Sequence, residues 1–152
     1  MRFRNANNAD RKSIEGLIFP ILESYGLKPS PESTDSDLAD IESIYFQNGG
    51  IFDVLVNEEN EIVGTVAVHR TEDELCELRK MYLSKTARGH GNGKRLFSHA
   101  IDEARKLGYK RIWLETADAL VEAKNLYTAF GFSPFEGPHQ SPRCDLSMVL
   151  DL

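Results

Sequence analysis

The sequence predicts a mixed α/β fold, and three patterns along the chain support this. Short β-rich runs at 51–56, 62–68 and 75–83 follow one another with turns between them, as in an antiparallel meander. After residue 83 the pattern changes to helix, strand, helix and strand, which is typical of a βαβ crossover. A weak first strand and two helical patterns precede the meander. The predicted order is therefore β α α β β β α β α β.

The N-terminal half is assigned from apolar spacing and turn residues. Residues 1–6 alternate weakly and predict the first strand. Asp10 can cap a helix over 11–25, which Pro20 would kink or divide. Ser36 or Asp37 can cap a second helix, after a proline-containing loop. Asn57 to Asn60 predicts the hairpin turn between the first two β-rich runs.

The C-terminal half has clearer ends. A helix after Gly93 has an apolar stripe at helical spacing, and Gly108 is placed to end it. Residues 111–115 predict a short strand. A helix over 119–130 ends before Gly131, and residues 144–150 predict the last strand.

The composition is that of one globular domain over residues 1–152. Hydrophobic residues make up 41% of the 152 residues and charged residues 28%. No apolar run approaches the roughly 20 residues of a membrane span, and the first residues lack the apolar stretch of a signal peptide. We therefore expect a cytoplasmic protein with no membrane partner.

Charge and cysteine content limit the function classes. The net charge of −6 argues against nucleic acid as a partner. Cys76 and Cys144 form no C-x-x-C or Cys/His cluster, so we expect no metal site and read both as small apolar residues, although a pairing in space stays open. One basic segment interrupts the acidic chain: residues 79, 80, 85, 88, 94 and 95 are Lys or Arg.

Within this basic segment, residues 83–95 have the features of a phosphate site. A strand ends, Gly89, Gly91 and Gly93 follow, and a helix starts. The first N–H groups of a helix have no partner within the helix, and glycine lets a ligand approach them closely. Lys94 and Arg95 lie in the first turn, where the helix dipole disfavours cations by about 0.3–1 kcal/mol each. This start therefore favours an anion.

The glycine spacing excludes two common phosphate motifs. The dinucleotide pattern G-x-G-x-x-G fails because Lys94 or Leu96 stands where the last glycine belongs. The P-loop fails because Arg95 follows Gly93-Lys94 where Ser or Thr is required. The pattern R-x-x-G-x-G over residues 88–93 remains. On its own it is also consistent with glycines that merely open an unoccupied helix.

An ordered set of motifs makes the sequence resemble the GCN5-related N-acetyltransferase (GNAT) superfamily. A strand over 77–83 precedes Arg88-x-x-Gly91-x-Gly93. The helix, the strand Ile112-Trp113-Leu114-Glu115-Thr116 and then Ala123-x-x-Leu126-Tyr127-x-x-x-Gly131-Phe132 follow in the family's order. The specific part covers 61–135, and the rest fits the same layout.

The resemblance implies a mostly antiparallel sheet with helices on both faces, splayed between the strands at 75–83 and 111–116. It implies acetyl-CoA as co-substrate, lying in that cleft. Backbone groups of the strand would pair with the pantetheine arm, and N–H groups of 88–94 would hold the pyrophosphate. The cofactor-binding residues expected on this basis are Met81, Tyr82, Leu83, Arg88, Gly89, His90, Gly91, Asn92, Gly93, Lys94 and Asn125. One departure is Leu120, which stands where many relatives have a pantetheine-binding Asn.

The reaction implied is attack of a neutral amine on the acetyl thioester. By resemblance Tyr127 would serve the departing thiolate; without the family it would be read as a core tyrosine. Glu77 is the candidate base, directly or through water, or else an exposed strand carboxylate paired with Arg79 or Lys80. Glu115 is a weaker candidate. A backbone N–H near Met81 or Leu83 would stabilise the oxyanion.

The acceptor is expected to be a small-molecule or peptide amine. Its site would be shaped by residues 11–46 and 134–143. An acidic rim in the first region would favour a cationic amine, or it is merely a solvated surface; its members are Glu23, Glu32, Asp35, Asp37, Asp40 and Glu42. Arg143 and His139 could instead bind a carboxylate. His69, His99 and His139 read as surface residues. A non-catalytic acyl-CoA-binding module on the same fold is the alternative function, and a homodimer stays open because dimers are frequent in the superfamily.

Overall fold

The computed structural model describes residues 1–138 and 141–152, and these form a mixed sheet with helices on both faces. Within this part of the chain, seven strands are ordered β1-β2-β3-β4-β5-β7-β6, and of the adjacent pairs β4–β5 alone is parallel. The predicted mixed, mostly antiparallel sheet is confirmed. The strands are β1 (Arg2–Asn5), β2 (Ile51–Val56), β3 (Ile62–Arg70), β4 (Leu75–Leu83), β5 (Arg111–Thr116), β6 (Ser133–Pro134) and β7 (Leu146–Asp151).

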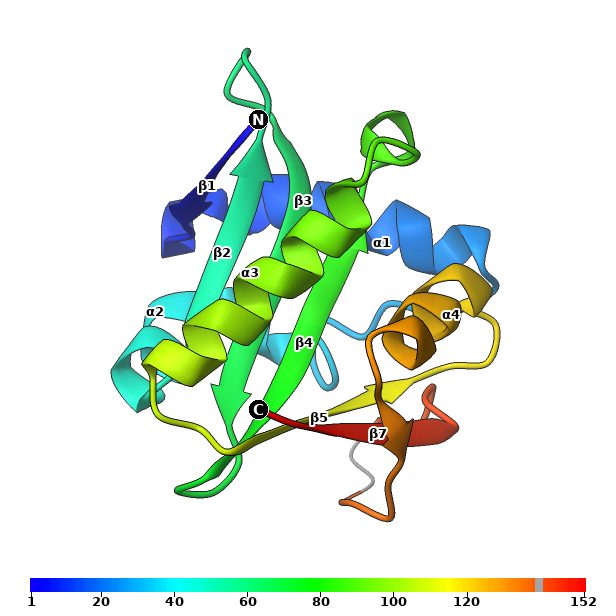
Figure 1. Ribbon diagram of the computed structural model, residues 1–152. Helices are drawn as coiled ribbons and strands as arrows, with labels where there is room; N and C mark the ends of the chain where they lie inside the picture. Colours follow the sequence, from blue (N-terminus) through cyan, green and yellow to red (C-terminus); the bar gives the residue numbers. More distant parts are fainter. Residues whose placement is uncertain (139–140) are drawn as a thin grey trace.

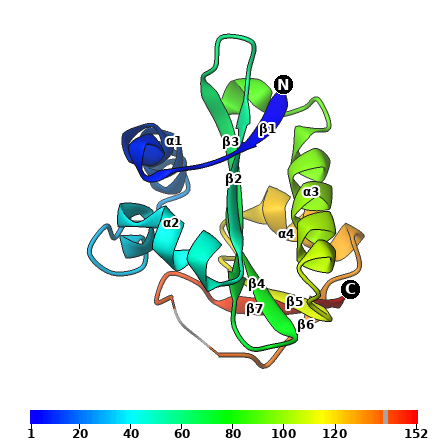
Figure 2. The same cartoon turned by 90° about the vertical axis from the view of Figure 1, so that its left-hand side faces the viewer.

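The helices divide between the two faces of the sheet. Figure 2 shows α1 (Arg11–Ser24) and α2 (Ile41–Ile44) on one face, with α3 (Asn92–Lys106) and α4 (Val121–Ala129) on the other. Each face has its own apolar core, because the sheet separates two clusters of buried side chains. Fully burying one such aliphatic side chain stabilises the fold by roughly 1.5–3 kcal/mol. The core under α3 includes Leu96, Phe97, Ala100 and Ala104, and the core under α1 and α2 includes Ile14, Ile18, Leu22, Leu38 and Ile41.

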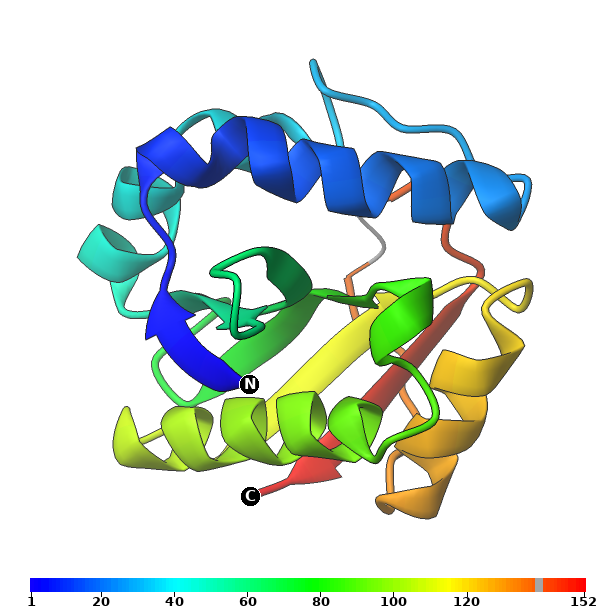
Figure 3. The same ribbon diagram turned by 90° about the horizontal axis from the view of Figure 1, so that it is seen from above.

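The helix predicted at 11–25 forms, but it is not divided at Pro20. Helix α1 is continuous from Arg11 to Ser24, as Figure 3 shows. A proline inside a helix costs about 3 kcal/mol. Ile18 and Leu22 lie on either side of Pro20 and are fully buried against the sheet. This packing outweighs the local cost.

The predicted caps of the first two helices are wrong in detail. The Asp10 carboxylate does not cap α1; it accepts hydrogen bonds from Arg4 at 2.9 Å and from the Asn7 N–H at 2.9 Å. Residues Ser36–Ala39 form a 3₁₀ turn, and Asp40 caps the short α2 by accepting from the Ser43 N–H at 3.2 Å. Arg4 of β1 binds the Asp10 carboxylate, and Asn8 donates to Asp40, and helix patterns alone do not show either contact.

The sheet opens between β4 and β5, as expected. Their register covers only Leu75↔Arg111 to Glu77↔Trp113. Beyond Glu77 the two strands run apart, and Figure 1 shows them meeting at one end only. Cys76 and Cys144 are both free. No helix of the described residues is long and apolar enough to cross a membrane.

Candidate active site

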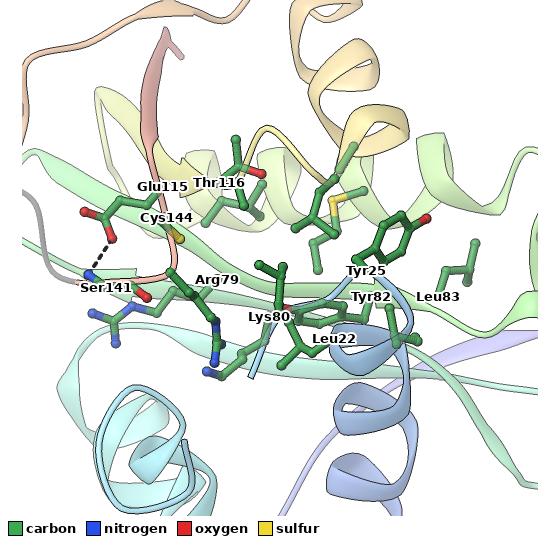
Figure 4. Close-up of a pocket in the computed structure, with 18 of the residues that line it drawn as sticks. Leu22, Tyr25, Arg79, Lys80, Tyr82, Leu83, Glu115, Thr116, Ser141 and Cys144 are labelled. Carbon is green, nitrogen blue, oxygen red and sulfur yellow. Dashed lines mark hydrogen bonds between the residues drawn. The ribbon is translucent and has the colours of Figure 1, made fainter. Parts of the chain in front are cut away.

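A cavity of about 700 Å³ lies where β4 and β5 separate. This volume is typical of small-molecule sites. Its walls come from β4, β5, α1, α4, the start of α3 and residues 141–144. In Figure 4, Glu115 and Ser141 lie at one end of the cavity and Tyr25 and Leu83 at the other. Of the expected cofactor-binding residues, Met81, Tyr82, Leu83, Arg88, Gly89 and Gly93 line it.

The glycine loop leads to the start of α3 with its backbone exposed. Gly89 and Gly91 have φ of 81° and 76°, the left-handed region that glycine adopts freely. A Cβ at either position would meet nothing within 4 Å. Helix α3 has no side-chain cap and no acidic residue in its first turn. Unmatched N–H groups beside open space fit the phosphates of coenzyme A.

The other expected loop residues do not line the cavity. The Asn92 side chain is buried and donates to the Ala87 carbonyl at 2.9 Å, so it holds the loop together. His90, Gly91 and Lys94 are exposed around the loop. Asn125 is exposed on α4, outside the cavity lining. Cofactor contacts of these residues stay predictions.

Strand β4 carries a bulge beside the cavity. Thr65 of β3 pairs with Tyr82 and Ala67 pairs with Arg79, so Lys80 and Met81 together face one residue of β3. Lys80 has a φ of 52°, a conformation that costs a non-glycine residue about 1–2 kcal/mol. The Thr65 hydroxyl donates to the Lys80 carbonyl at 2.6 Å. The bulge interrupts the ladder between the two strands and turns β4 backbone toward the cavity.

Tyr127 lies on the inward face of α4, as predicted. It is 6% exposed, and its ring packs against Phe97 and Phe132. Its hydroxyl is 3.9 Å from the Met81 sulfur, so it reaches the bulge across the cavity. Burial raises the pKa of this hydroxyl far above 10.0 and keeps it protonated. The phenol is therefore a donor at the bulge.

Glu77 precedes the bulge, inside the cavity. It accepts from Arg79 Nε at 2.6 Å, so the predicted pairing with Arg79 exists, but Glu77 is buried at 5% exposure rather than exposed. Burial raises the pKa of the Glu77 carboxyl above 4.5, and the Arg79 guanidinium limits the rise. Glu115 also lines the cavity and accepts from the Ser141 N–H at 3.0 Å.

A buried network of charges supports the wall beside the bulge. Asp35, with a side-chain exposure of 0%, accepts from both terminal nitrogens of Arg143 at 2.8 Å and from Lys80 Nζ at 2.7 Å. Lys80 Nζ also lies 3.3 Å from Asp37, which accepts from the Tyr45 hydroxyl. Sequence reasoning missed this network. Its members are up to 108 residues apart, and no local pattern marks them.

Comparisons with known proteins identify the family. A family model described as "Acetyltransferase (GNAT) family" matches residues 18–132. The uncharacterized N-acetyltransferase YjgM of Escherichia coli K12 is 33% identical over 151 residues, covering 94% of this chain and 90% of the relative. The chain belongs to the GNAT family. Its fold matches a GNAT acetyltransferase from Staphylococcus aureus Mu50 with a TM-score of 0.93 at 23% identity, covering 99% of this chain and 98% of the other.

Family membership makes the chain an N-acetyltransferase and supports acetyl-CoA as its co-substrate. A putative acetyltransferase from Salmonella typhimurium, crystallised with its cofactor acetyl-CoA, has the same fold with a TM-score of 0.72 and 23% identity. It covers 99% of this chain and 93% of that one.

Two of the expectations about histidines in this GNAT protein need correction. His69 is not a surface residue: it lines the cavity against Tyr45, and burial lowers its pKa to about 4. His99 is not solvated, since it bonds Asp53 at 2.7 Å and stacks on Phe3. His139 lies outside the described residues.

The acidic rim expected around the acceptor does not line the cavity as a group. Of its members Asp37 alone is in the lining, among the described residues. Asp35 is buried behind the wall, and Asp40 and Glu42 bond Asn8 and the start of α2. Asp35 is satisfied by internal cations, whereas Asp40 and Glu42 are exposed but lie outside the cavity lining.

Proposed function

We propose that this single domain, residues 1–152, transfers the acetyl group of acetyl-CoA to a primary amine by direct attack within a ternary complex. The observation that carries the proposal is the convergence of Tyr127, Glu77 and the β4 bulge on one cavity, next to an open helix N-terminus. Acid, base and backbone donors are the groups that the chemistry needs.

Each group has a role that fits its surroundings. Glu77 takes the proton from the attacking amine, and its raised pKa suits a base that works near neutral pH. Backbone N–H groups near Met81 or Leu83 donate to the developing oxyanion. Tyr127 donates a hydrogen bond to the departing thiolate. The N–H groups at residues 88–94 hold the pyrophosphate, and acetyl-CoA supplies the activated acyl group.

The charges favour a cationic amine over an acceptor held by its carboxylate. Both terminal nitrogens of Arg143 already bond Asp35, and Lys80 bonds the same carboxylate. These cations are neutralised within the protein. Glu77, which pairs with Arg79, and Glu115, which accepts from the Ser141 N–H, are acidic groups of the lining that can attract an ammonium group.

Calorimetry with acetyl-CoA, followed by thiol release with a panel of amines, tests the proposal. The panel pairs spermidine and L-lysine with L-glutamate and tyramine. We expect micromolar binding of acetyl-CoA and the fastest thiol release with spermidine and L-lysine, which carry a second ammonium group besides the one that is acetylated. Tyr127→Phe should lower kcat about tenfold or more, with acetyl-CoA affinity nearly unchanged. Binding of acetyl-CoA without thiol release for any amine would favour an acyl-CoA-binding module. No binding of acetyl-CoA would contradict the proposed acetyl transfer.

A further inference from the structure

Lys80 is held unusually firmly for a lysine on a cavity wall. Its side chain is 7% exposed, and its ammonium reaches the Thr34 carbonyl at 3.4 Å, Asp35 at 2.7 Å and Asp37 at 3.3 Å. The contacts with Thr34 and Asp35 are hydrogen bonds, and the contact with Asp37 is an ion pair. The backbone of the same residue is left-handed, with a φ of 52°. A side-chain anchor therefore acts on a backbone conformation that lysine does not favour.

Asp35 is the centre of this anchor. It also accepts from the Ser30 N–H at 2.9 Å, which fixes the carboxylate within its own loop. Through Arg143 it joins this loop to the segment before β7, and through Lys80 to the β4 bulge. Three segments far apart in the sequence thus meet at one buried carboxylate.

The anchored bulge lies at the proposed reaction centre. Met81 follows Lys80 directly and contacts the Tyr127 hydroxyl, while Glu77 precedes the bulge in the same strand. A change in the backbone at Lys80 would turn the Met81 N–H away from the position where an oxyanion would lie. A misplacement of about 1 Å can cost about 100-fold in rate.

We propose that Asp35 is a positioning residue that keeps the β4 bulge in its productive conformation through Lys80. The inference rests on the proposed acetyl transfer and assigns Asp35 no contact with either substrate. If Asp35 only stabilised the fold, its loss would lower the free energy of unfolding. The effect on kcat would then not depend on whether residue 80 adopts the left-handed conformation easily.

Two substitutions at residue 80 separate these roles. Lys80→Ala and Lys80→Gly both remove the ammonium, but glycine adopts the left-handed conformation freely and alanine does not. With acetyl-CoA and the amine that the wild type acetylates fastest, we expect kcat of Lys80→Ala to be about tenfold below that of Lys80→Gly. Equal kcat values for the two variants would overturn the proposal.

Asp35→Asn completes the test. It should lower kcat about tenfold in the wild-type background and less than about twofold in the Lys80→Gly background, since residues acting through one another are not additive. The matched control is Asp10→Asn, which breaks another two-pronged Asp–Arg pair, with Arg4, outside the cavity lining. A similar loss of kcat in Asp10→Asn would mean a general effect of stability.

Amide hydrogen exchange provides a readout that needs no activity. The amides of residues 80–83 should exchange faster in Asp35→Asn and in Lys80→Ala, while those of β2 stay as in the wild type. Unchanged exchange at the bulge would overturn the inference. If the wild type releases no thiol with any amine, the proposed function fails, and exchange alone decides whether Asp35 positions the bulge.

Discussion

The two sides of the cavity are built in opposite ways. The cofactor side, residues 83–95, offers backbone N–H groups between glycines, and the Cβ positions of Gly89 and Gly91 face open space. The acceptor side, residues 33–37, 77–80 and 141–144, is made of charged side chains bonded to one another. Under the proposed function, the first side would recognise acetyl-CoA through main-chain groups, and the second would hold the amine with fixed side chains.

The difference bears on how each side can vary. Backbone recognition asks only for glycine at certain positions, so many side chains on the cofactor side are free to change. On the acceptor side a change in Asp35 leaves two buried cations without their shared partner, which costs about 3–5 kcal/mol when a buried pair is broken. We therefore expect the acceptor side to be the less tolerant of single substitutions.

The largest expected effect on kcat/KM comes from substituting Glu77 on the acceptor side. Glu77→Gln should lower kcat/KM about 1,000-fold and leave acetyl-CoA affinity unchanged, because it removes the base and keeps the shape. In the wild type, kcat/KM should rise with pH through the Glu77 pKa, which is raised above 4.5. The variant should lose this part of the profile.

The pH dependence of stability should have the opposite sign to that of kcat/KM. The folded state binds the Glu77 proton more tightly than the unfolded chain, so the free energy of unfolding should fall as pH rises through the raised pKa.

Glu115→Gln is the matched control for the activity of Glu77→Gln. If it removes the acid limb and Glu77→Gln does not, Glu115 is the base.

Substitution of Gly91 should weaken acetyl-CoA binding on the cofactor side. Gly91→Glu places a carboxylate where the pyrophosphate binds and forces a side chain into a φ of 76°, so acetyl-CoA affinity should fall about 100-fold by calorimetry. Gly108→Glu is the control, since Gly108 has a φ of 91°, equally open space and a place at the far end of α3. The same loss in both variants would contradict binding at the loop.

The smallest effect is expected for Asn92, whose side chain tests whether the glycine loop binds acetyl-CoA through its backbone alone. Asn92→Ala removes the hydrogen bond to the Ala87 carbonyl and should lower the free energy of unfolding by about 1 kcal/mol in urea titrations. Acetyl-CoA affinity should change less than about threefold, because the backbone makes the contact. A loss of tenfold or more would show that this side chain recognises the cofactor.

Local patterns were sufficient for most of the fold. Strand β4 has the bounds that its β-rich run predicts, and Gly108 and Gly131 follow α3 and α4 with left-handed φ of 91° and 97°. These signals are reliable because they depend on neighbours in sequence. Predictions failed where contacts outside the helix decided: Pro20 stays inside α1, Asp10 bonds Arg4 instead of capping that helix, and Asp40 caps α2 in place of Ser36 or Asp37. The two-residue β6 had no pattern to mark it.

The candidate site divides in the same way. Residues 83–95 could be read as a phosphate site from the sequence, because glycines and a helix start lie together in the chain. Tyr127 could be placed on the inward face of α4 from its spacing, although its role came from the family resemblance. Only the tertiary structure could bring Asp35, Lys80 and Arg143 together, because ion pairs across 45 and 108 residues depend on how the loops pack and not on any local preference. The bulge at Lys80 was hidden for the same reason: a lysine in a strand predicts an extended backbone, whereas Lys80 has a φ of 52° and its ammonium pairs with buried carboxylates from another segment.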